Sequence, residues 1–290
     1  MDCDCNIYGN KEGILVNKLD NYTVIMSIYH KVNPEHLRIS INSILNQTYK
    51  TNEFIIIKDG KLTIEQENIL EPIVRDNKNI IKIFEFEENM GAGQAYNKGI
   101  EMCTNKWAAI MDSDDFAVEN KFEKQMTYLF DHSDIDAIGT NAVEFLDNFE
   151  NIVSTRIMPE SNDEIIKFGH GRCPMIQPTV IFKVDSVKKA GSYQHSPLTE
   201  DFDLYIRMIM NNCKFYTYQE VLYYIRTSED FFKRRGGFKY LKPILSFKYK
   251  YYKKGYFTFF QFLKTAVSSL IMALLPNSIR TFLYKRFLRN

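Results

Sequence analysis

The sequence predicts an α/β domain in which helices cover both faces of a mostly parallel β-sheet. Short, continuous runs of apolar and β-branched residues indicate strands that are buried on both faces. Amphipathic helical patterns lie between these runs, as expected of parallel strands joined by crossover helices. The chain has 290 residues and is 45% hydrophobic, which allows a large core and excludes a disordered chain.

Strands and helices alternate clearly up to residue 120. Apolar runs predict four strands, and apolar residues spaced by three or four predict the helices between them. Pro34 is a typical first residue of a helix. In chain order, we expect a strand over 23–29, a helix from Pro34, a strand over 53–58, a helix over 64–75, a strand over 80–86, a helix over 94–103 and a strand over 107–111.

The pattern is less regular after residue 120. Two of the expected strands pair across a polar turn over 147–151, and from Gly236 onward the chain is basic, aromatic and mostly helical. We expect a helix over 122–130, strands over 137–145 and 152–158, a short strand over 179–182, a helix over 202–210, and short strands over 215–218 and 221–225.

Three acidic residues, Asp112, Asp114 and Asp115, follow the strand over 107–111. They fall at the carboxyl end of a parallel strand, where open α/β sheets bind their ligands. Crowded carboxylates repel one another unless a cation relieves them, and Mg²⁺ or Mn²⁺ prefers oxygen ligands. The pattern therefore indicates a cation site, with a solvated turn before the helix at Lys121 as the alternative.

Asp59 and the pair Glu200–Asp201 are further candidate site residues. Asp59 follows the strand over 53–58, so it is either part of a plain Asp-Gly turn or a ligand-binding carboxylate at the same sheet edge. Glu200 and Asp201 precede an amphipathic helix. Acids at that position either cap the helix or supply a general base for a hydroxyl.

The charge is divided unevenly along the chain. The formal net charge is +1, but residues 231–290 contain 14 of the 37 Lys and Arg and no acidic residue. The same segment holds 16 Phe and Tyr, and basic residues alternate with aromatic ones over 247–254. Cations attract anionic lipid, and Phe and Tyr lie at the headgroup boundary. We therefore expect attachment to a membrane surface through 237–290, with helices that merely pack on the α/β domain as the alternative.

No recognition motif supports a nucleic-acid partner for this basic segment, and we expect none. Its most apolar part, 256–275, is interrupted by Lys264, and a span needs about 20 apolar residues. We therefore expect an interfacial or re-entrant helix, with a transmembrane span as the alternative. The five cysteines are odd in number and form no C-x-x-C, and the first 20 residues lack the apolar region of a signal peptide. We expect a cytoplasmic protein, peripheral on the inner face of the cell membrane.

Twelve short motifs follow one another along the chain: Tyr22–Tyr29, Ser43–Tyr49, Lys58–Gly60, Asn89–Gly91, Asn97–Gly99, Asp112–Asp115, Gln177–Phe182, Ala190–Tyr193, Thr199–Leu204, Tyr224–Arg226, Ser228–Asp230 and Arg234–Gly237. In this collinear order, they resemble the family 2 glycosyltransferases, in particular those that build bacterial surface polysaccharides. The resemblance implies a glycosyltransferase A-type fold. It also implies an N-terminal extension over 1–21, a catalytic domain over 22–236 and a C-terminal basic-aromatic helical region over 237–290.

The resemblance assigns a role to each candidate residue. Asp59 resembles the residue that reads the nucleobase, often uracil, and Asp112 the one that faces the ribose. Asp114 resembles the ligand of Mg²⁺ or Mn²⁺, and Asp201 the catalytic base. The other nucleotide-sugar-binding residues that it implies are Tyr29, Asn97, Arg226, Arg234 and Arg235, with the arginines on a loop that closes over the diphosphate.

The implied reaction is an inverting transfer of a sugar from a UDP-sugar to a hydroxyl of a lipid-linked saccharide or glycan. Three places depart from the family pattern. Lys58 stands where an acid or Asn often precedes the Asp-Gly pair, and Gln177 stands where related sequences often have His. Gln94 and Tyr96, and not a basic residue, lie near the position of Asn97. Two other functions stay open, a nucleotidyltransferase with a related acidic metal site and a non-catalytic sugar-nucleotide-binding protein. Release of nucleoside diphosphate or of pyrophosphate separates the two enzymes.

Overall fold

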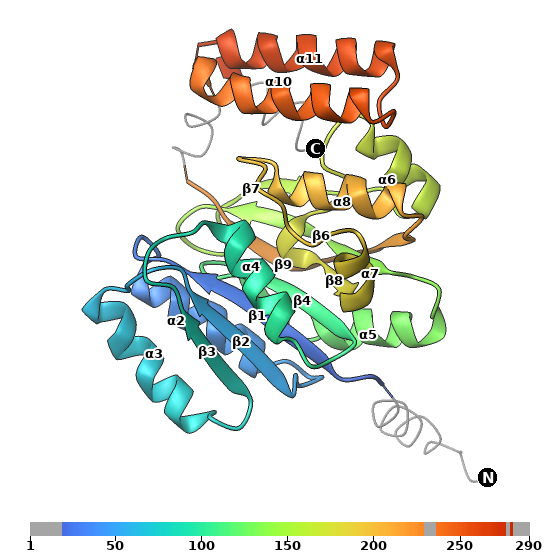
Figure 1. The fold of residues 1–290 in the computed structure, drawn as a ribbon. Coiled ribbons are helices and arrows are strands. Elements are labelled where there is room, and N and C mark those ends of the chain that lie inside the picture. The colour runs from blue at the N-terminus through green and yellow to red at the C-terminus, as the bar shows by residue number, and fades with distance from the viewer. Residues whose placement is uncertain (1–18, 229–235, 277–278, 281–290) are drawn as a thin grey trace, which may run out of the picture.

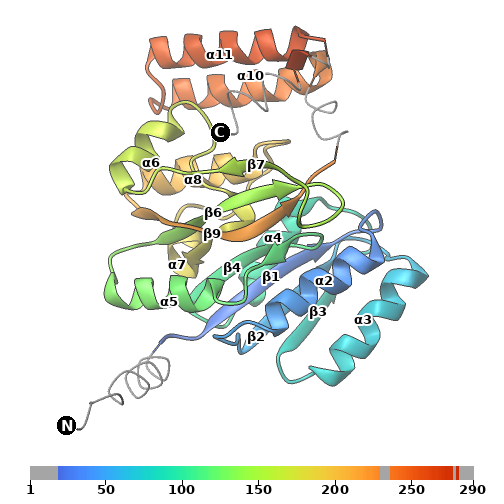
Figure 2. The same ribbon diagram turned by 180° about the vertical axis from the view of Figure 1, so that it is seen from behind.

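The computed structural model describes residues 19–228, 236–276 and 279–280, and Figures 1 and 2 show it from opposite sides. Its strands are β1 (Tyr22–Ile28), β2 (Glu53–Lys58), β3 (Ile81–Glu85), β4 (Trp107–Asp112), β5 (Phe116–Ala117), β6 (Ala137–Phe145), β7 (Ile152–Arg156), β8 (Ile181–Lys183) and β9 (Phe215–Arg226). Within the described residues, these nine strands form one sheet in the order β3-β2-β1-β4-β8-β6-β9-β5, with β7 paired to β6.

The sheet is parallel in one half and mixed in the other. β1 pairs in parallel with both β2 and β4, and β2 pairs in parallel with β3. β8 is antiparallel to its neighbours β4 and β6, whereas β6 and β9 are parallel. The structure confirms the α/β class, and the four strands predicted before residue 120 form the parallel half.

Helices cover both faces of the sheet, as predicted. The helices are α2 (Pro34–Leu45), α3 (Ile64–Asp76), α4 (Ala92–Met102), α5 (Lys121–Asp131), α6 (Asn162–Gly169), α7 (Val184–Lys189), α8 (Glu200–Met210), α10 (Gly237–Lys253), α11 (Phe259–Leu274) and the 3-10 helix η1 (Gln177–Thr179). α2, α3 and α5 bury Leu37, Leu70 and Phe122 against the face that is nearer the viewer in Figure 2. α4 and α7 bury Ile100 and Val187 on the opposite face, together with α8 (Figure 1).

One expectation for the second half was wrong. The strands expected over 215–218 and 221–225 are a single strand, β9, which runs along β6. Thr140 of β6 lies opposite Tyr218, but the next residue lies opposite Val221. Gln219 and Glu220 are therefore extra residues in a bulge, and these polar side chains interrupt the apolar pattern without ending the strand.

Several short elements were not predicted. β5 has only two residues, and α6 and α7 are short helices. α6 begins with a capping box of Ser161 and Glu164, a helix-start signal that is visible in the sequence. The strand expected over 179–182 is η1 followed by β8, with Pro178 in the first turn of η1.

The C-terminal helices α10 and α11 form a hairpin that lies on α8 (Figure 1). Phe247 and Tyr251 of α10 share a buried cluster with Phe202 and Ile206 of α8. The two residues on each helix are four positions apart, so they lie on one face of that helix, and the two faces pack against each other. The hairpin is thus packed on the helix that carries Asp201.

The expectation that the basic and aromatic side chains over 247–254 face lipid is wrong for three of them. Phe247, Lys248 and Tyr251 are buried. The Lys248 Nζ donates to the carbonyl of Thr265 at 2.6 Å, which joins α10 to α11. Helical periodicity turns these positions inward, and composition alone does not show this. Among the described helices, none is long and apolar enough to cross a membrane.

Candidate active site

The carboxyl ends of β1, β2 and β4 meet at one edge of the sheet. Ser27 of β1 lies opposite Asp112 of β4, and Ile28 of β1 lies opposite Lys58 of β2. Asp59 follows at the same edge, where its N–H donates to the carbonyl of Ile28 at 2.7 Å. The structure therefore brings Asp59 and the acidic turn after β4 to one place, as the sequence predicted.

Asp112 is held on three sides. The Tyr96 hydroxyl donates to its Oδ1 at 2.7 Å, and the Ser40 hydroxyl donates to its carbonyl at 2.9 Å. The N–H of Asp112 donates to the Tyr223 hydroxyl at 3.3 Å. Burial and the neighbouring charge of Asp114 raise the pKa of Asp112 to about 6.

Asp114 and Asp115 crowd the same turn. Asp115 is buried, and its Oδ1 accepts from the N–H of Arg226 at 2.7 Å. Its Oδ2 has no hydrogen-bond partner in the part of the chain that the structure describes. Burial raises the pKa of both carboxyls, and the charges of Asp112 and Asp114 raise that of Asp115 further. Three carboxylates in such a turn favour the binding of a cation.

The oxygen atoms of this turn fit Mg²⁺ or Mn²⁺. Both ions prefer carboxylate oxygen, and Asp114 is partly accessible while Asp115 is buried, so Asp114 is the better placed of the two to reach a ligand. Among the described residues, no group of three or more His, Cys, Asp or Glu side chains is arranged so that the group alone could hold a metal ion. A cation here needs oxygen ligands beyond those of the described carboxylates, and substrate phosphates supply such ligands to Mg²⁺.

Arg226, the last residue of β9, reaches over the acidic turn. Its Nε donates to the carbonyl of Asp114 at 3.0 Å, and its Nη1 donates to the carbonyl of Asp147 at 3.1 Å. The guanidinium lies over the ring of Phe145, 4.6 Å from the centroid. These contacts fix a cationic side chain beside the three carboxylates.

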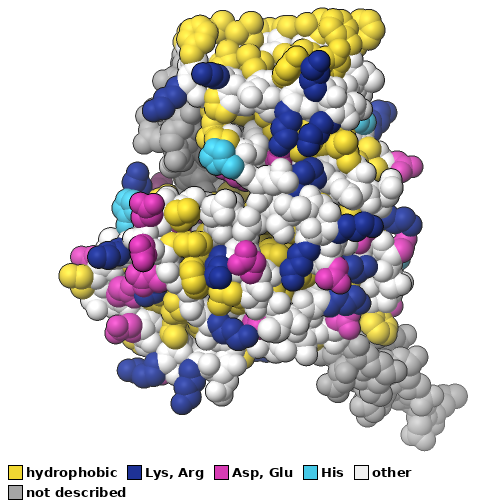
Figure 3. Space-filling view, viewed as in Figure 1, with side chains coloured by type: hydrophobic (Ala, Val, Ile, Leu, Met, Phe, Trp, Pro, Cys, Tyr) yellow, Lys and Arg dark blue, Asp and Glu magenta, His cyan; other side chains and the backbone are white. Residues whose placement is uncertain are grey.

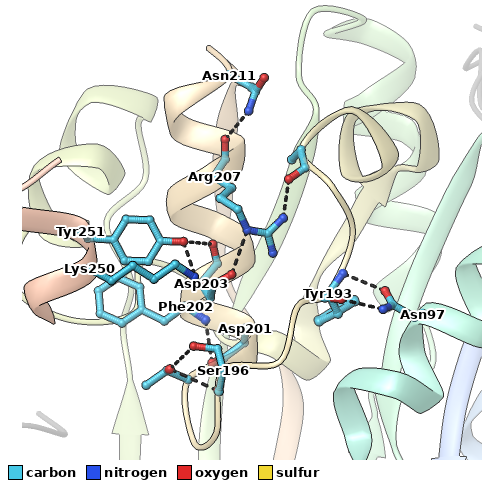
Figure 4. A network of polar contacts seen from close by, with 12 residues as sticks. Asn97, Tyr193, Ser196, Asp201, Phe202, Asp203, Arg207, Asn211, Lys250 and Tyr251 are labelled. Carbon is cyan, nitrogen blue, oxygen red and sulfur yellow. Dashed lines mark hydrogen bonds and ion pairs between the residues drawn. The ribbon is translucent and has the colours of Figure 1, made fainter. Parts of the chain in front are cut away.

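Asp201 lies in the first turn of α8 (Figure 4). Its Oδ1 accepts from the N–H of Phe202 at 2.7 Å, and its Oδ2 lies 3.5 Å from the Sγ of Cys173. After burial and the charge of Asp114, the charge of Asp201 is a further cause of the raised pKa of Asp112.

The contacts of Tyr96 also group α8 with the acidic turn after β4. Its hydroxyl binds Asp112, and its ring lies 5.5 Å from the ring of Tyr193, whose hydroxyl accepts from Gln177. Gln177 in turn binds Tyr205 of α8, so these contacts connect the acidic turn to the helix that carries Asp201.

The loop before α8 has a defined shape. The hydroxyls of Ser196 and Thr199 share a hydrogen bond of 2.8 Å, and the carbonyl of Thr199 accepts from the N–H of Asp203 at 2.8 Å. Leu198 has a φ of 68°, in the left-handed region, and its side chain is 56% exposed. A bulky residue there costs about 1 kcal/mol, so the surrounding contacts hold the loop in this shape.

Asp59 has a structural partner that sequence reasoning did not anticipate. Its Oδ1 accepts from the N–H of Met90 at 2.6 Å. Its Oδ2 accepts from the side chain of Asn89 at 2.9 Å and from the N–H of Gly91 at 3.0 Å. The carboxylate thus organises the loop that leads into α4. A carboxylate has about four acceptor positions, so one is left for a ligand.

Asn97 also holds a loop. Its Nδ2 donates to the carbonyl of Tyr193 at 2.6 Å, and its Oδ1 accepts from the N–H of Tyr193 at 2.7 Å (Figure 4). Tyr29 is 40% exposed at the end of β1. Arg234 and Arg235 lie outside the described residues. The roles of these residues in nucleotide-sugar binding stay predictions.

Gln177, which departs from the family pattern, bridges two tyrosines. Its amide donates to the Tyr193 hydroxyl, and its Oε1 accepts from the Tyr205 hydroxyl. Burial raises the pKa of both phenols, and the charge of Asp201 raises it further. Gln177 therefore ties together residues that lie close to Asp201.

Sequence reasoning missed four residues of the site, namely His36, Tyr96, Cys173 and Tyr223. His36 lies in the first turn of α2, and burial lowers its pKa, as does the charge of Arg226, while Asp114 opposes the shift. Its position just after the carboxyl end of β1 was the one available signal. Tyr96 stands beside the Asn97–Gly99 motif, where it is a departure from the family pattern, whereas Cys173 and Tyr223 lie outside the motifs.

The same fold is found in solved glycosyltransferases. The mannosyltransferase PcManGT from Pyrobaculum calidifontis, in complex with GDP-Man and Mn²⁺, matches with a TM-score of 0.63 at 14% identity, over 92% of this chain and 80% of that chain. S. aureus TarS 1–349 in complex with UDP matches with a TM-score of 0.57 at 18% identity, over 92% and 70%. The fold and its acidic sheet edge therefore define a glycosyltransferase A-type protein.

The model of Glycosyl transferase family 2 matches residues 23–189, and this chain belongs to that family. The UDP-Gal:alpha-D-GlcNAc-diphosphoundecaprenol beta-1,3-galactosyltransferase of Escherichia coli is 32% identical over 92% of this chain and 96% of its own length. The amylovoran biosynthesis glycosyltransferase AmsE of Erwinia amylovora is 30% identical over 76% and 82%. The chain is thus a bacterial glycosyltransferase, and no finding favours a nucleotidyltransferase or a non-catalytic binding protein.

Proposed function

We propose that this glycosyltransferase moves a sugar, with inversion, from a UDP-sugar to a hydroxyl of a lipid-linked saccharide in the assembly of a surface polysaccharide. The observation that carries the proposal is the chain of contacts through Tyr96, Tyr193 and Gln177. It connects the acidic turn, which contains Asp112 and Asp114, to α8, the helix that carries Asp201. By their names, the relatives act on a lipid diphosphate-linked sugar and in amylovoran biosynthesis. Related solved chains hold UDP or UDP-GlcNAc, which supports a uridine nucleotide as the donor.

The donor binds along the carboxyl edge of the sheet. Asp59 accepts from the nucleobase through its remaining lone pair, and Asp112 faces the ribose. Tyr29 lies at the same edge, and Asn97 acts by holding the Tyr193 loop in place. This arrangement lets the nucleotide span the ends of β1, β2 and β4, where α/β sheets bind ligands.

The diphosphate binds beside the acidic turn. Asp114 would hold Mg²⁺ or Mn²⁺, and the bound cation would neutralise the charge that develops on the leaving nucleoside diphosphate. Arg226, which already lies over this turn, supplies a fixed positive charge at the same place. The resemblance adds Arg234 and Arg235, which lie outside the described residues, as further cations for the diphosphate.

Asp201 serves as the single general base. The acceptor oxygen forms a bond to C1 of the sugar from the face opposite the nucleotide, while the bond from C1 to the diphosphate oxygen breaks. The electron pair of that bond leaves with the nucleoside diphosphate, and the hydroxyl proton passes to Asp201. Because one displacement occurs, one carboxylate is sufficient and the configuration at C1 inverts.

The enzyme works at the cytoplasmic surface of the membrane, through the outer face of α11. Phe260, Leu263, Val267, Ile271 and Leu274 form a stripe along this helix, and their side chains are 45% to 79% exposed. Figure 3 shows hydrophobic side chains gathered over α11, with basic side chains below them. Such a face suits the headgroup boundary of an anionic bilayer.

Sedimentation with vesicles that contain anionic lipid tests this surface. We expect the combined variant Phe260→Ser, Leu263→Ser and Ile271→Ser to leave most of the protein in the supernatant. Ile64→Ser on α3 is the matched control, because Ile64 is 77% exposed and apolar but lies far from α11 in the chain. Equal sedimentation of all the variants would rule out α11 as the membrane face.

The reaction itself is tested with a panel of UDP-, GDP- and dTDP-sugars with Mn²⁺. We expect consumption of a UDP-sugar with release of UDP, inhibition by EDTA, and an inverted anomeric configuration in the product by NMR. Release of pyrophosphate, or a product of retained configuration, would refute the proposed reaction.

A further inference from the structure

A groove of about 360 Å³ lies between α10 and the loop that leads into α8. The loop contributes 195–197 to one wall, and α10 contributes Lys242, Phe247 and Lys250 to the other. None of these residues has a role in the reaction described above. The groove is lined by none of the residues of the acidic turn and is separate from it.

The lining of the groove is cationic. Among the described residues, its charged side chains are Lys242 and Lys250, and no described carboxylate lines it. Lys250 and Arg207 both pair with the buried carboxylate of Asp203. One negative charge therefore faces two positive charges, and one positive charge is in excess. Lys242 is exposed and forms no ion pair with any described residue. The groove therefore offers positive charge to an anion from solution.

The groove lies next to Asp201. The ring of Phe247, in its wall, packs on the ring of Phe202, with centroids 5.0 Å apart. Phe202 follows Asp201 in the chain, and its N–H donates to the Asp201 carboxylate. A single residue, Phe202, therefore connects the wall of the groove to Asp201.

On its other side, the groove borders the C-terminal hairpin. Its wall helix, α10, packs on α11, whose outer face is apolar and exposed. From the C-terminal hairpin toward the active site, the molecule thus presents the apolar face of α11, then the cationic groove, and then the carboxylate of Asp201. An acceptor with an apolar tail, a phosphate and a saccharide hydroxyl presents its groups in the same order.

We propose that this groove binds the phosphate of the lipid-linked acceptor. The proposal rests on the function proposed above and adds where the acceptor is held. Lys242 and Lys250 contact the phosphate as point charges, and Phe247 is part of the apolar wall of the groove. No bond forms or breaks in the groove, which positions the acceptor so that its hydroxyl reaches Asp201.

Binding of farnesyl diphosphate to the full chain tests the groove without knowledge of the acceptor saccharide. Calorimetry in mild neutral detergent, with UDP and Mn²⁺ in excess, keeps the donor site filled. We expect Lys242→Gln to weaken binding roughly tenfold, as for loss of a charged hydrogen bond. Lys239→Gln is the matched control, since it removes the same charge from an exposed site on α10 outside the groove wall.

Each outcome decides the assignment. Equal weakening by both substitutions would mean that general charge, and not the groove, attracts the probe. Binding of inorganic pyrophosphate as tightly as farnesyl diphosphate would refute a lipid-linked ligand. Loss of all farnesyl diphosphate binding when UDP is added would place the probe at the donor site and overturn the proposal. Turnover of a UDP-sugar by the wild-type enzyme, measured separately, shows whether the proposed function itself fails.

Discussion

The hydroxyl of Tyr251 on α10 donates a hydrogen bond of 2.7 Å to Oδ1 of Asp203 on α8 (Figure 4). Asp203 is fully buried and also accepts from Lys250 at 2.5 Å and from Arg207 at 2.8 Å. It lies two residues after Asp201 on the same helix. The hairpin that we assign to the membrane is therefore joined to the helix that carries the base.

Removing this carboxylate should destabilise the whole enzyme. Asp203→Ala leaves Arg207 without its anion, and we expect the free energy of unfolding to fall by about 3 kcal/mol. Tyr251→Phe removes one hydrogen bond and should cost about 1 kcal/mol. Urea denaturation measures both changes. Unchanged midpoints would show that the hairpin and α8 are not coupled.

The hydrogen bonds to Asp203 also predict how the stability of the enzyme depends on pH. Burial by itself raises the pKa of Asp203, but hydrogen bonds from Lys250, Tyr251 and Arg207 outweigh it and hold the pKa below its ordinary value. The stability that Asp203 supplies is therefore present above its unfolded pKa of about 3.9 and is lost as the pH falls through the folded pKa. The difference in stability between wild type and Asp203→Ala should narrow as the pH falls below 4.

Asp114→Ala tests the metal ligand. We expect the variant to lose the rise in melting temperature that Mn²⁺ with UDP gives the wild type. The ligand-free variant should be no less stable, because removing one of three crowded carboxylates relieves repulsion. Asp131→Ala, at the end of α5, is the control. An undiminished Mn²⁺-dependent shift in Asp114→Ala would exclude the ligand role.

Asp59→Ala separates the two roles of Asp59. The carboxylate accepts three hydrogen bonds from residues 89–91, so its loss should lower the stability of the nucleotide-free enzyme by about 2 kcal/mol. UDP binding should weaken as well. If nucleobase reading were its only role, differential scanning fluorimetry would find the ligand-free melting temperature unchanged.

Lys121→Met should stabilise the enzyme. Lys121 is fully buried, and its Nζ has no hydrogen-bond partner among the described residues. The rings of Phe122 and Tyr223 lie 4.1 and 5.9 Å away and offset part of the cost of burying the charge. Met fills a similar space without a charge, so we expect a gain of about 1 to 2 kcal/mol at pH 7.

This gain should depend on pH. Burial lowers the pKa of Lys121 well below its ordinary value. The unfolded state therefore binds the proton more strongly, and the cost of burying Lys121 shrinks as the pH rises toward about 10.4. The advantage of Met should be smaller at pH 9 than at pH 7. A loss of stability at both values would indicate a hidden partner for the ammonium group.

The parallel half of the fold was predictable because strands buried on both faces leave unbroken apolar runs, such as 53–58 before Asp59. The second half was not, because the bulge at Gln219 and Glu220 places polar residues inside one strand. In the C-terminal hairpin, composition could not separate the buried Lys248 from the exposed Lys264. Charge counts carry no information about which side of a helix a residue occupies.

The acidic turn and Asp201 were recognisable because they are short motifs at element ends. Their supports were not, since Tyr96 and Cys173 reach the carboxylates of Asp112 and Asp201 only through the tertiary fold. Asn97 lay in a motif, but its partner is the backbone of a loop about a hundred residues away, which no local pattern shows.

The most direct test of the central claim is the turnover of Asp201→Asn. With the donor found in the nucleotide-sugar panel, we expect kcat for transfer to fall by a factor of about 10² to 10⁴. UDP and Mn²⁺ binding should stay as in the wild type, because the substitution keeps the shape of the side chain. Transfer at the wild-type rate would contradict the assignment of Asp201 as the base.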